Sequence, residues 1–389
     1  MVDAIRGFAL AGIVILHNLE HFLIRASPEY NPLCFSAIDP TMRNIISSLF
    51  SGKAYGVFSL LFGFSFWIQY ESQQKRGYSY TSRFAWRMVL LLGLGILNRL
   101  FYLGDVLSIY ALMSIVLILT RNWSNRRILF LVALLLLQPV DIARTIYSYY
   151  HPEYELVSNV WHLSDHLKEI QINGPFHKMM LLNVSYGYLN SVIWNWEFGR
   201  AFQTPALFLI GMLAARKRWF SEVNPRFWLT LSGVSLLVAI PIHCLSSLLL
   251  THIHRGLLLE LATNLTGLYL NLPVMTFMLS LMVLIWHYID QGRKVLAVFA
   301  PFGRMSLTNY IAQSIIGTTL YMGYSLGLYR YCGPTLSFAI GAVTLGIQLF
   351  WSHWWLKRFN QGPLEFLWKK GTWVGHKYYR SIHLVKQPV

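Results

Sequence analysis

Charged residues are scarce in this chain, because only 12% of its 389 residues are Asp, Glu, Lys or Arg. Soluble domains carry about 25% charged residues, whereas 55% of this chain is hydrophobic. Cysteine is also rare. The three cysteines, Cys34, Cys244 and Cys332, have neither CxxC nor Cys/His spacing, so a zinc or redox site has little support and at most one disulfide is expected. The composition therefore excludes an ordinary soluble protein and indicates a membrane protein.

Apolar runs long enough to cross the roughly 30 Å hydrocarbon core of a bilayer recur along the chain. We predict an all-α polytopic membrane bundle of about ten transmembrane helices. No small-residue cleavage pattern follows the first run, so we expect it to be the first span and not a signal peptide. The expected spans are residues 5–24, 46–70, 84–102, 105–120, 128–148, 201–216, 227–250, 260–287, 305–325 and 335–356.

Lysine and arginine gather in every second loop of this arrangement. They cluster within 75–87, 121–127, 216–218 and 293–294, and again in the tail after 356. Since cytoplasmic loops of membrane proteins are enriched in these residues, both termini are expected in the cytoplasm. The formal net charge of +16 then reflects topology, and no nucleic-acid partner is expected.

The chain is expected to divide into three parts. Residues 1–356 form the transmembrane bundle, 149–200 within them form an extracytoplasmic or interfacial loop, and 357–389 form a basic cytoplasmic tail on anionic lipid. In the loop, the aromatic stretch "NVSYGYLNSVIWNW" predicts a helix at the outer membrane interface. His162 and His166, in "HLSDH", have a spacing that can bind metal, and Asp165 could orient one ring. No third ligand is near them in sequence, so solvated histidines are favoured and no metal is expected.

The first apolar run carries four polar side chains on one helical face. Arg6 and His17 are eleven residues apart, which is a rotation of only about 20° on a helix, and Glu20 and His21 lie within about 60° of His17. The axial rise puts His17 about 16 Å from Arg6, at or beyond the membrane midplane. Two interpretations remain open: a snorkelling arginine with a histidine that only joins helices, or a water-filled or substrate-lined cavity.

Further polar residues fall at similar depths in the next spans. Lys53 lies near the outer end of the second span, and Arg99 and Asp105 flank the outer turn between the third and fourth. These side chains could meet His17 and Glu20. An equally favoured interpretation of Arg99 and Asp105 is a hairpin held by an ion pair and a helix cap.

At the cytoplasmic side, Arg6, Arg87 and Arg304 form a basic rim that suits a phosphate-bearing ligand, because arginine binds phosphate through a planar fork of donors. Asn309 and Gln313 follow Arg304 and share one helix face. Hydrogen bonding between helices is the favoured interpretation of these two amides.

Several motifs together resemble one family. "VDAIRGFALAGI", "FSLLFGFSF", "GDVLSIYAL", "FGRMSLTNYIAQS" and "FNQGPLEFLWKK" are similar to the YeiB-like family of bacterial inner-membrane proteins, a domain of unknown function (DUF418). The part from Phe302 to Trp368 is the most specific, and the stretch before Asp3 is shorter than is usual there. The family resembles a wider superfamily of transmembrane acyltransferases, in which an arginine and a histidine spaced as Arg6 and His17 are linked to acyl transfer.

The resemblance implies acyl transfer across a bacterial inner membrane, from cytosolic acyl-CoA, such as acetyl-CoA, to a small-molecule or glycan acceptor outside. Arg6, Arg304 and Arg87, with Asn309 and Gln313, would receive acyl-CoA. His17 would be the general base or acyl carrier, Glu20 or Asp105 would orient it, and Lys53 or Arg99 would stabilise the oxyanion. A carrier or flippase of an amphipathic anion and a non-enzymatic membrane component remain alternatives. Membrane lipids are expected partners, and a homodimer is compatible with the sequence.

Overall fold

The computed structural model of the chain describes residues 1–24, 35–151, 168–253 and 256–376. These residues are helical throughout and contain no strand, which confirms the predicted all-α class. His162 and His166, whose spacing could bind metal, and Asp165 lie outside the described residues. The first helices are α1 (Val2–Leu19), α2 (Asp39–Phe50), α3 (Lys53–Lys75), α4 (Thr81–Arg99), α5 (Leu107–Met113), α6 (Ile115–Thr120), α7 (Asn125–Leu136) and α8 (Pro139–Tyr150).

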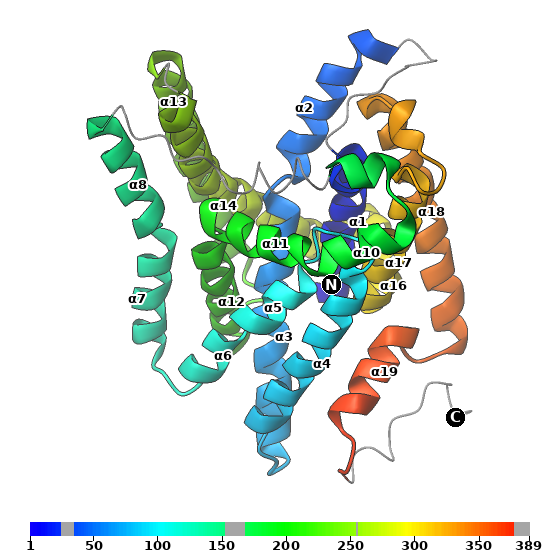
Figure 1. Cartoon of the computed structure of the whole chain (residues 1–389). Helices are drawn as coiled ribbons and strands as arrows, with labels where there is room; N and C mark the ends of the chain where they lie inside the picture. Colours follow the sequence, from blue (N-terminus) through cyan, green and yellow to red (C-terminus); the bar gives the residue numbers. More distant parts are fainter. Residues whose placement is uncertain (25–34, 152–167, 254–255, 377–389) are drawn as a thin grey trace.

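The second part of the chain begins with two helices, α10 and α11, that run across the bundle in front of α3 and α4 (Figure 1). The helices of this part are α10 (Phe176–Val184), α11 (Tyr186–Glu197), α12 (Arg200–Arg216), α13 (Pro225–His252), α14 (Gly256–Tyr288), α15 (Asp290–Ala297), α16 (Ala300–Arg304), α17 (Ser306–Tyr321), α18 (Pro334–Arg358) and α19 (Pro363–Thr372). Short 3₁₀ turns η1 (His21–Leu23), η2 (Phe35–Ala37) and η3 (Leu328–Arg330) connect some of them.

Among the described residues, six segments are long and apolar enough to cross a membrane: Val2–Leu19, Asp39–Lys75, Asn125–Tyr150, Pro225–His252, Gly256–Tyr288 and Pro334–Arg358. The pair α11 and α12, bent by 74°, could add a seventh. The membrane character is therefore supported, and the count of about ten stays a prediction. The expected spans 84–102, 105–120 and 305–325 correspond to α4, the pair α5 and α6, and α17, which are shorter or more polar.

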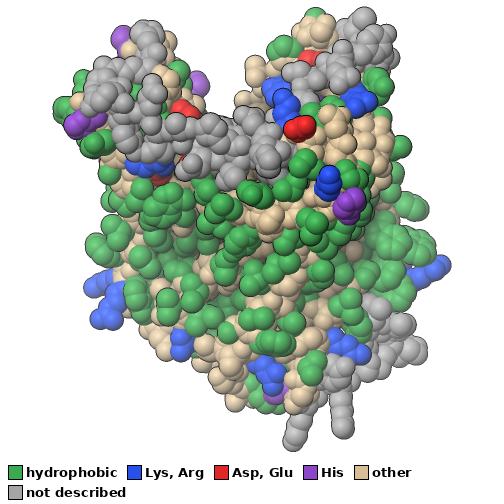
Figure 2. Space-filling view, viewed as in Figure 1, with side chains coloured by type: hydrophobic (Ala, Val, Ile, Leu, Met, Phe, Trp, Pro, Cys, Tyr) green, Lys and Arg blue, Asp and Glu red, His purple; other side chains and the backbone are tan. Residues whose placement is uncertain are grey.

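The outer surface is apolar around its middle. Figure 2 shows hydrophobic side chains spread as a band across the molecule, with lysine and arginine mainly near its two ends. Phe130, Leu237 and Phe350 are each more than 70% exposed. Soluble monomers rarely expose a contiguous apolar surface of this extent, whereas lipid tails accept it.

Helices α3 and α12 form a close parallel pair. Glycines let their backbones touch, because a Cβ at Gly63 would clash with the carbonyl of Phe208 and one at Gly211 with the carbonyl of Leu60. Near the helix starts, the hydroxyls of Tyr55 and Thr204 hydrogen-bond. Toward the other end of the pair, the ring of Trp67 on α3 contacts Arg216, the last residue of α12, so the two helices run in the same direction and their N-termini lie side by side.

Several basic loops meet at the other end of this pair. The Arg216 guanidinium donates to the carbonyls of Arg121 at 2.6 Å and Trp123 at 2.8 Å. It also lies over the ring of Trp67, 4.1 Å from the centroid. The structure thus groups loops that the charge pattern assigns to one side of the membrane, and the side itself stays a prediction.

Candidate functional site

His17 lies in the bundle among aromatic rings. Its ring centroid is 4.9 Å from that of Tyr102, 5.7 Å from Phe22 and 6.4 Å from Tyr310. The residue keeps some exposure, while its Nδ1 atom is buried and has no hydrogen-bond partner. The His17 ring is therefore surrounded by three aromatic rings, two of which carry a hydroxyl group. Its Nδ1 atom makes no hydrogen bond.

The chain after His17 makes a strained turn. His21, Phe22 and Leu23 have φ values of 47°, 53° and 72°, a left-handed conformation that costs energy for residues other than glycine. Phe22 is held there by contact with Gly317 on α17, where any Cβ would clash with its ring. His21 Nε2 lies 2.7 Å from Ser337 Oγ on α18. Packing against two helices thus maintains the turn next to His17.

Asp105 fixes the connection between α4 and α5. Its Oδ2 accepts from the Ser108 backbone N–H at 2.9 Å and from Ser108 Oγ at 2.7 Å, and its Oδ1 accepts from Asn98 at 2.9 Å. Arg99 Nη2 lies 3.9 Å from Asp105 Oδ2. This geometry matches the predicted hairpin with an ion pair and a helix cap.

Arg99 is 1% exposed, and its donors are largely occupied. Nη1 donates to the carbonyls of Leu103 and Gly187 and to Ser191 Oγ, at 3.4, 3.0 and 3.0 Å. The guanidinium therefore ties α11 to the end of α4. This role is structural, while Nε is left without a partner, and the oxyanion role of Arg99 stays a prediction.

Tyr102 and Tyr310 link His17 to this hairpin. Tyr102 lies within electrostatic range of both Glu20 and Asp105. The Tyr310 hydroxyl accepts from the Val106 backbone N–H at 3.1 Å, which leaves its own proton free to donate. Glu20 ends α1 and is exposed. The structure thus gathers His17, Glu20 and Asp105 around two tyrosines that sequence reasoning missed.

Lys53 belongs to a different part of the bundle. It begins α3 and is 9% exposed, and the charged group recorded near it is Arg200 at the start of α12. The Arg200 guanidinium lies over the ring of Tyr55, 5.1 Å from its centroid. Lys53 makes no hydrogen bond or ion pair with the described residues around His17. Arg200 was missed, although it follows Gly199 as Lys53 follows Gly52.

Each of the three arginines of the predicted basic rim has a contact of its own. Arg6 donates to Asp3 Oδ1 at 2.7 Å and to Ser65 Oγ at 2.8 Å. Arg304 donates to the Asn360 carbonyl at 2.9 Å. Arg87 lies over the Trp368 ring, 3.6 Å from its centroid. Each cation therefore already has a partner in this structure.

The two amides of α17 differ from each other. Asn309 donates to Ser352 Oγ on α18 at 2.8 Å, the helix-joining hydrogen bond that was favoured. Gln313 is fully buried, and neither its Oε1 nor its Nε2 has a partner. An amide left unsatisfied in this way is costly unless water or a ligand reaches it.

The two most specific sequence motifs contact each other. Glu365, in "QGPLE", accepts from the backbone N–H groups of Leu307 and Thr308 at 2.7 and 3.0 Å, and from Thr308 Oγ1 at 2.6 Å. Leu307 and Thr308 belong to "GRMSLTNY", so α19 caps the N-terminus of α17. Burial raises the pKa of the Glu365 carboxyl above its usual value, and the hydrogen bonds from Thr308 and Leu307 partly offset that rise.

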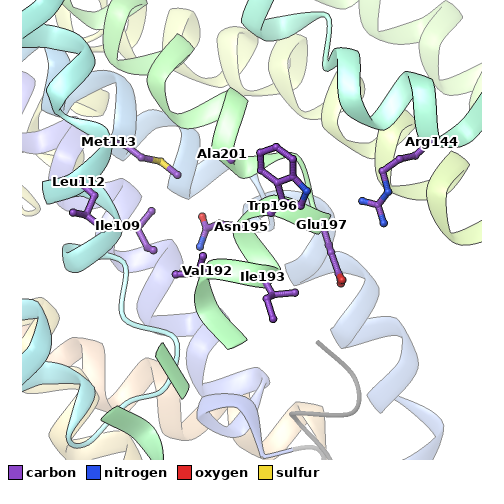
Figure 3. Close-up of a pocket in the computed structure, with 10 residues that line it drawn as sticks. All are labelled: Ile109, Leu112, Met113, Arg144, Val192, Ile193, Asn195, Trp196, Glu197 and Ala201. Atoms are coloured by element: carbon purple, nitrogen blue, oxygen red, sulfur yellow. The ribbon is translucent and has the colours of Figure 1, made fainter. Parts of the chain in front are cut away.

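A cavity of about 530 Å³ lies between α5, α8, α11 and α12. Its walls are mostly apolar, with Ile109, Met113 and Trp196 among them, whereas Arg144 and Glu197 project into the same space (Figure 3). An apolar cavity with a few charged groups suits an amphipathic ligand. Among the described residues, no group of three or more His, Cys, Asp or Glu side chains could hold a metal.

Comparison with known proteins finds similarity to one family. Residues 214–375 match the protein family of unknown function DUF418. The chain is 26% identical to the uncharacterized protein YxaH of Bacillus subtilis, over 96% of this chain and 94% of that protein. It is 27% identical to the uncharacterized protein YeiB of Escherichia coli, over 95% of each chain. The C-terminal part of the chain thus matches the DUF418 family, and nearly the whole chain is similar to YeiB and YxaH. This confirms the resemblance seen in its motifs, and no solved structure matches the chain.

Proposed function

We propose that this YeiB-like protein is a membrane acyltransferase that moves an acyl group from cytosolic acyl-CoA to a hydroxyl or amine acceptor on the other side of the membrane. The observation that carries the proposal is the position of the His17 side chain. Its ring lies on the polar face of α1, beside the hydroxyl-bearing rings of Tyr102 and Tyr310, with Nδ1 unpartnered. The unpartnered Nδ1 is the atom that would take the proton of the acceptor in a general-base mechanism.

In the proposed reaction, neutral His17 takes the proton of the acceptor hydroxyl or amine while that atom attacks the thioester carbonyl. The carbonyl becomes an oxyanion, and the hydroxyls of Tyr102 and Tyr310, whose rings lie beside His17, would donate hydrogen bonds to it. Collapse of the intermediate breaks the carbon–sulfur bond. The coenzyme A thiolate leaves and takes the proton back from His17, so that the enzyme returns to its starting state.

Acyl-CoA would approach from the Arg6 end of α1. The Arg6 guanidinium is partly exposed and holds Asp3 and Ser65, which lie at the helix start and on α3. Arg304 and Arg87 are fixed by Asn360 and Trp368 on the segment around α19. Phosphate groups could exchange for the weaker of these contacts, because charge-assisted hydrogen bonds to phosphate are strong.

The test uses the full chain in lipid nanodiscs with radiolabelled acetyl-CoA and a membrane extract as the source of acceptors. We expect labelled product from the wild type and a loss of at least about 100-fold in His17→Ala, the scale of a missing general base. His252→Ala, an exposed histidine at the end of α13, is the matched control and should keep its activity.

The alternatives give different results in the same system. A carrier would move an anionic solute into liposomes without acetyl-CoA, and its rate would not depend on acyl donor. A non-enzymatic component would do neither. Equal labelling by the wild type and His17→Ala would remove His17 from the reaction.

A further inference from the structure

Two helix N-termini meet side by side where α3 and α12 begin. Each starts in the same way: a left-handed glycine, Gly52 with φ 74° or Gly199 with φ 64°, precedes a cation, Lys53 or Arg200. Neither helix has a side-chain cap or an acidic residue in its first turn. A helix N-terminus carries partial positive charge, so a cation there is unfavourable. Two cationic side chains and the partial positive charges of two helix N-termini therefore lie together.

The two side chains lack the counter-charge that buried cations normally have. Lys53 is 9% exposed and makes no recorded hydrogen bond, and Arg200 Nε is buried without a partner. The ion pairs recorded for the described residues include neither of them. The carboxylate oxygen Asp141 Oδ2 lies beside Gly199 and is buried without a hydrogen-bond partner, so it does not pair with Arg200. Burying like charges without an ion pair is costly.

Polar groups suited to an oxyanion surround the two cations. The hydroxyls of Tyr55 and Thr204 hydrogen-bond to each other beside them. The Asn271 amide of α14 lies directly against Gly52. Arg200 is oriented by Gln203 Oε1, which accepts from Nη1, and by the rings of Tyr55 and Trp194. The guanidinium is thus held in place before any ligand arrives.

We propose that Lys53 and Arg200, at the paired N-termini of α3 and α12, bind the phosphate group of a ligand inside the bundle. A phosphate offers oxygens to an ammonium, a guanidinium and free backbone N–H groups together, and helix N-termini are common phosphate sites. The apolar cavity reaches Ala201, the next residue after Arg200 (Figure 3). The phosphate could therefore belong to a lipid-like molecule or to a soluble compound. The site does not require acyl transfer at His17.

The first experiment uses the full chain in phosphatidylcholine nanodiscs and compares inorganic phosphate with chloride at equal ionic strength. We expect phosphate to raise the melting temperature of the wild type by about 2 °C or more at saturation. Lys53→Gln and Arg200→Gln should lose this rise and bind phosphate at least about tenfold more weakly by calorimetry. Arg218→Gln, an exposed cation paired with Glu222, is the matched control and should respond like the wild type.

The second experiment distinguishes the sources of the phosphate. Nanodiscs with phosphatidylglycerol replace those with phosphatidylcholine, and stabilisation of the wild type that Lys53→Gln lacks would assign the site to a lipid phosphate. Stabilisation by free phosphate would assign it to a soluble ligand. The proposal is overturned if the wild type responds in neither arm, or if the Lys53 and Arg200 variants respond as it does.

Both variants should remain folded, because each removes one of two repelling charges. If either fails to fold, the wild type alone decides the question. Phosphate should then slow the modification of Lys53 by a small amine-reactive reagent at least about threefold, as measured by mass spectrometry, with Lys75 unchanged. An unchanged modification rate at Lys53 would overturn the proposal.

Discussion

Glu365 stabilises a helix to which it does not belong. Its carboxylate satisfies two N–H groups in the first turn of α17 that would otherwise be buried without partners. We expect Glu365→Ala to lower the free energy of unfolding by about 1–2 kcal/mol, the cost of a lost N-terminal cap. Thermal unfolding in detergent measures this, and Glu222→Ala, on an exposed pair, should change little. Equal effects of the two substitutions would contradict the capping role.

The same carboxyl predicts a pH dependence. Burial raises its pKa in the folded protein, so the native state binds a proton more tightly than the unfolded state does. The contribution of Glu365 to stability therefore falls as pH rises from its ordinary value of 4.5 through the raised folded value. Glu365→Gln cannot titrate, so the stability of the wild type relative to this variant should fall over that range and be constant above it. A difference that rises with pH would contradict the sign.

At this scale the sequence predicts residue types better than residue partners. The polar face of α1 was visible from the spacing of Arg6 and His17, and His17 does lie inside the bundle. Its neighbours Tyr102 and Tyr310 were not predicted, because aromatic residues are frequent in this chain and their positions depend on how helices pack. The position of Lys53 in its span predicts a depth in the membrane similar to that of His17. The side chain lies beside Arg200 instead, which only the tertiary structure reveals.

The pair α3 and α12 depends on two glycines. At Gly211 any side chain would meet the Leu60 carbonyl, and a backbone atom of a neighbouring helix cannot move away as a flexible side chain can. We expect Gly211→Ala to destabilise the protein by about 1–3 kcal/mol through overpacking. Gly233→Ala in α13, where no atom lies within 4 Å of the added methyl, is the control and should be neutral or slightly stabilising. Thermal unfolding in detergent compares them, and a similar loss in both would exclude close packing as the cause.

Helix existence was predictable from apolar runs, whereas helix breaks were not. The expected span 46–70 contains α2, a turn at Gly52 and α3. The expected span 128–148 is divided at Gln138, which has φ 51° and precedes Pro139. Both breaks occur at residues that commonly end helices, glycine and proline. Hydropathy averaged over a window conceals them because the run stays apolar on both sides.

The basic loops that contain Arg121 and Arg216 lie together at one end of the molecule, which predicts its orientation in the membrane. In a cysteine-free background, Arg126→Cys in a basic loop should be protected from an impermeable maleimide added outside the cell. Tyr150→Cys, 72% exposed at the end of α8, should be labelled. Labelling of Arg126→Cys and protection of Tyr150→Cys would reverse the proposed topology, and permeabilised cells control for reagent access.

Composition sufficed to predict the class of the molecule, because an apolar chain with few charges can bury its surface only in lipid. It did not determine how many helices cross the bilayer. Short helices such as α5 and α6, and the crossing pair α10 and α11, carry apolar residues for packing against other helices as well as for lipid contact. Hydropathy cannot separate these two uses, since both remove the side chain from water.

The cap that Glu365 provides also has a consequence for biogenesis. The ribosome completes α17 well before it makes α19, so the nascent bundle must wait with the first turn of α17 unsatisfied. A protein truncated before Pro363 would lack this cap and should be recognised by quality-control proteases as incomplete. The first turn of α17 would thus become stable only after the later segment that carries Glu365 has been made.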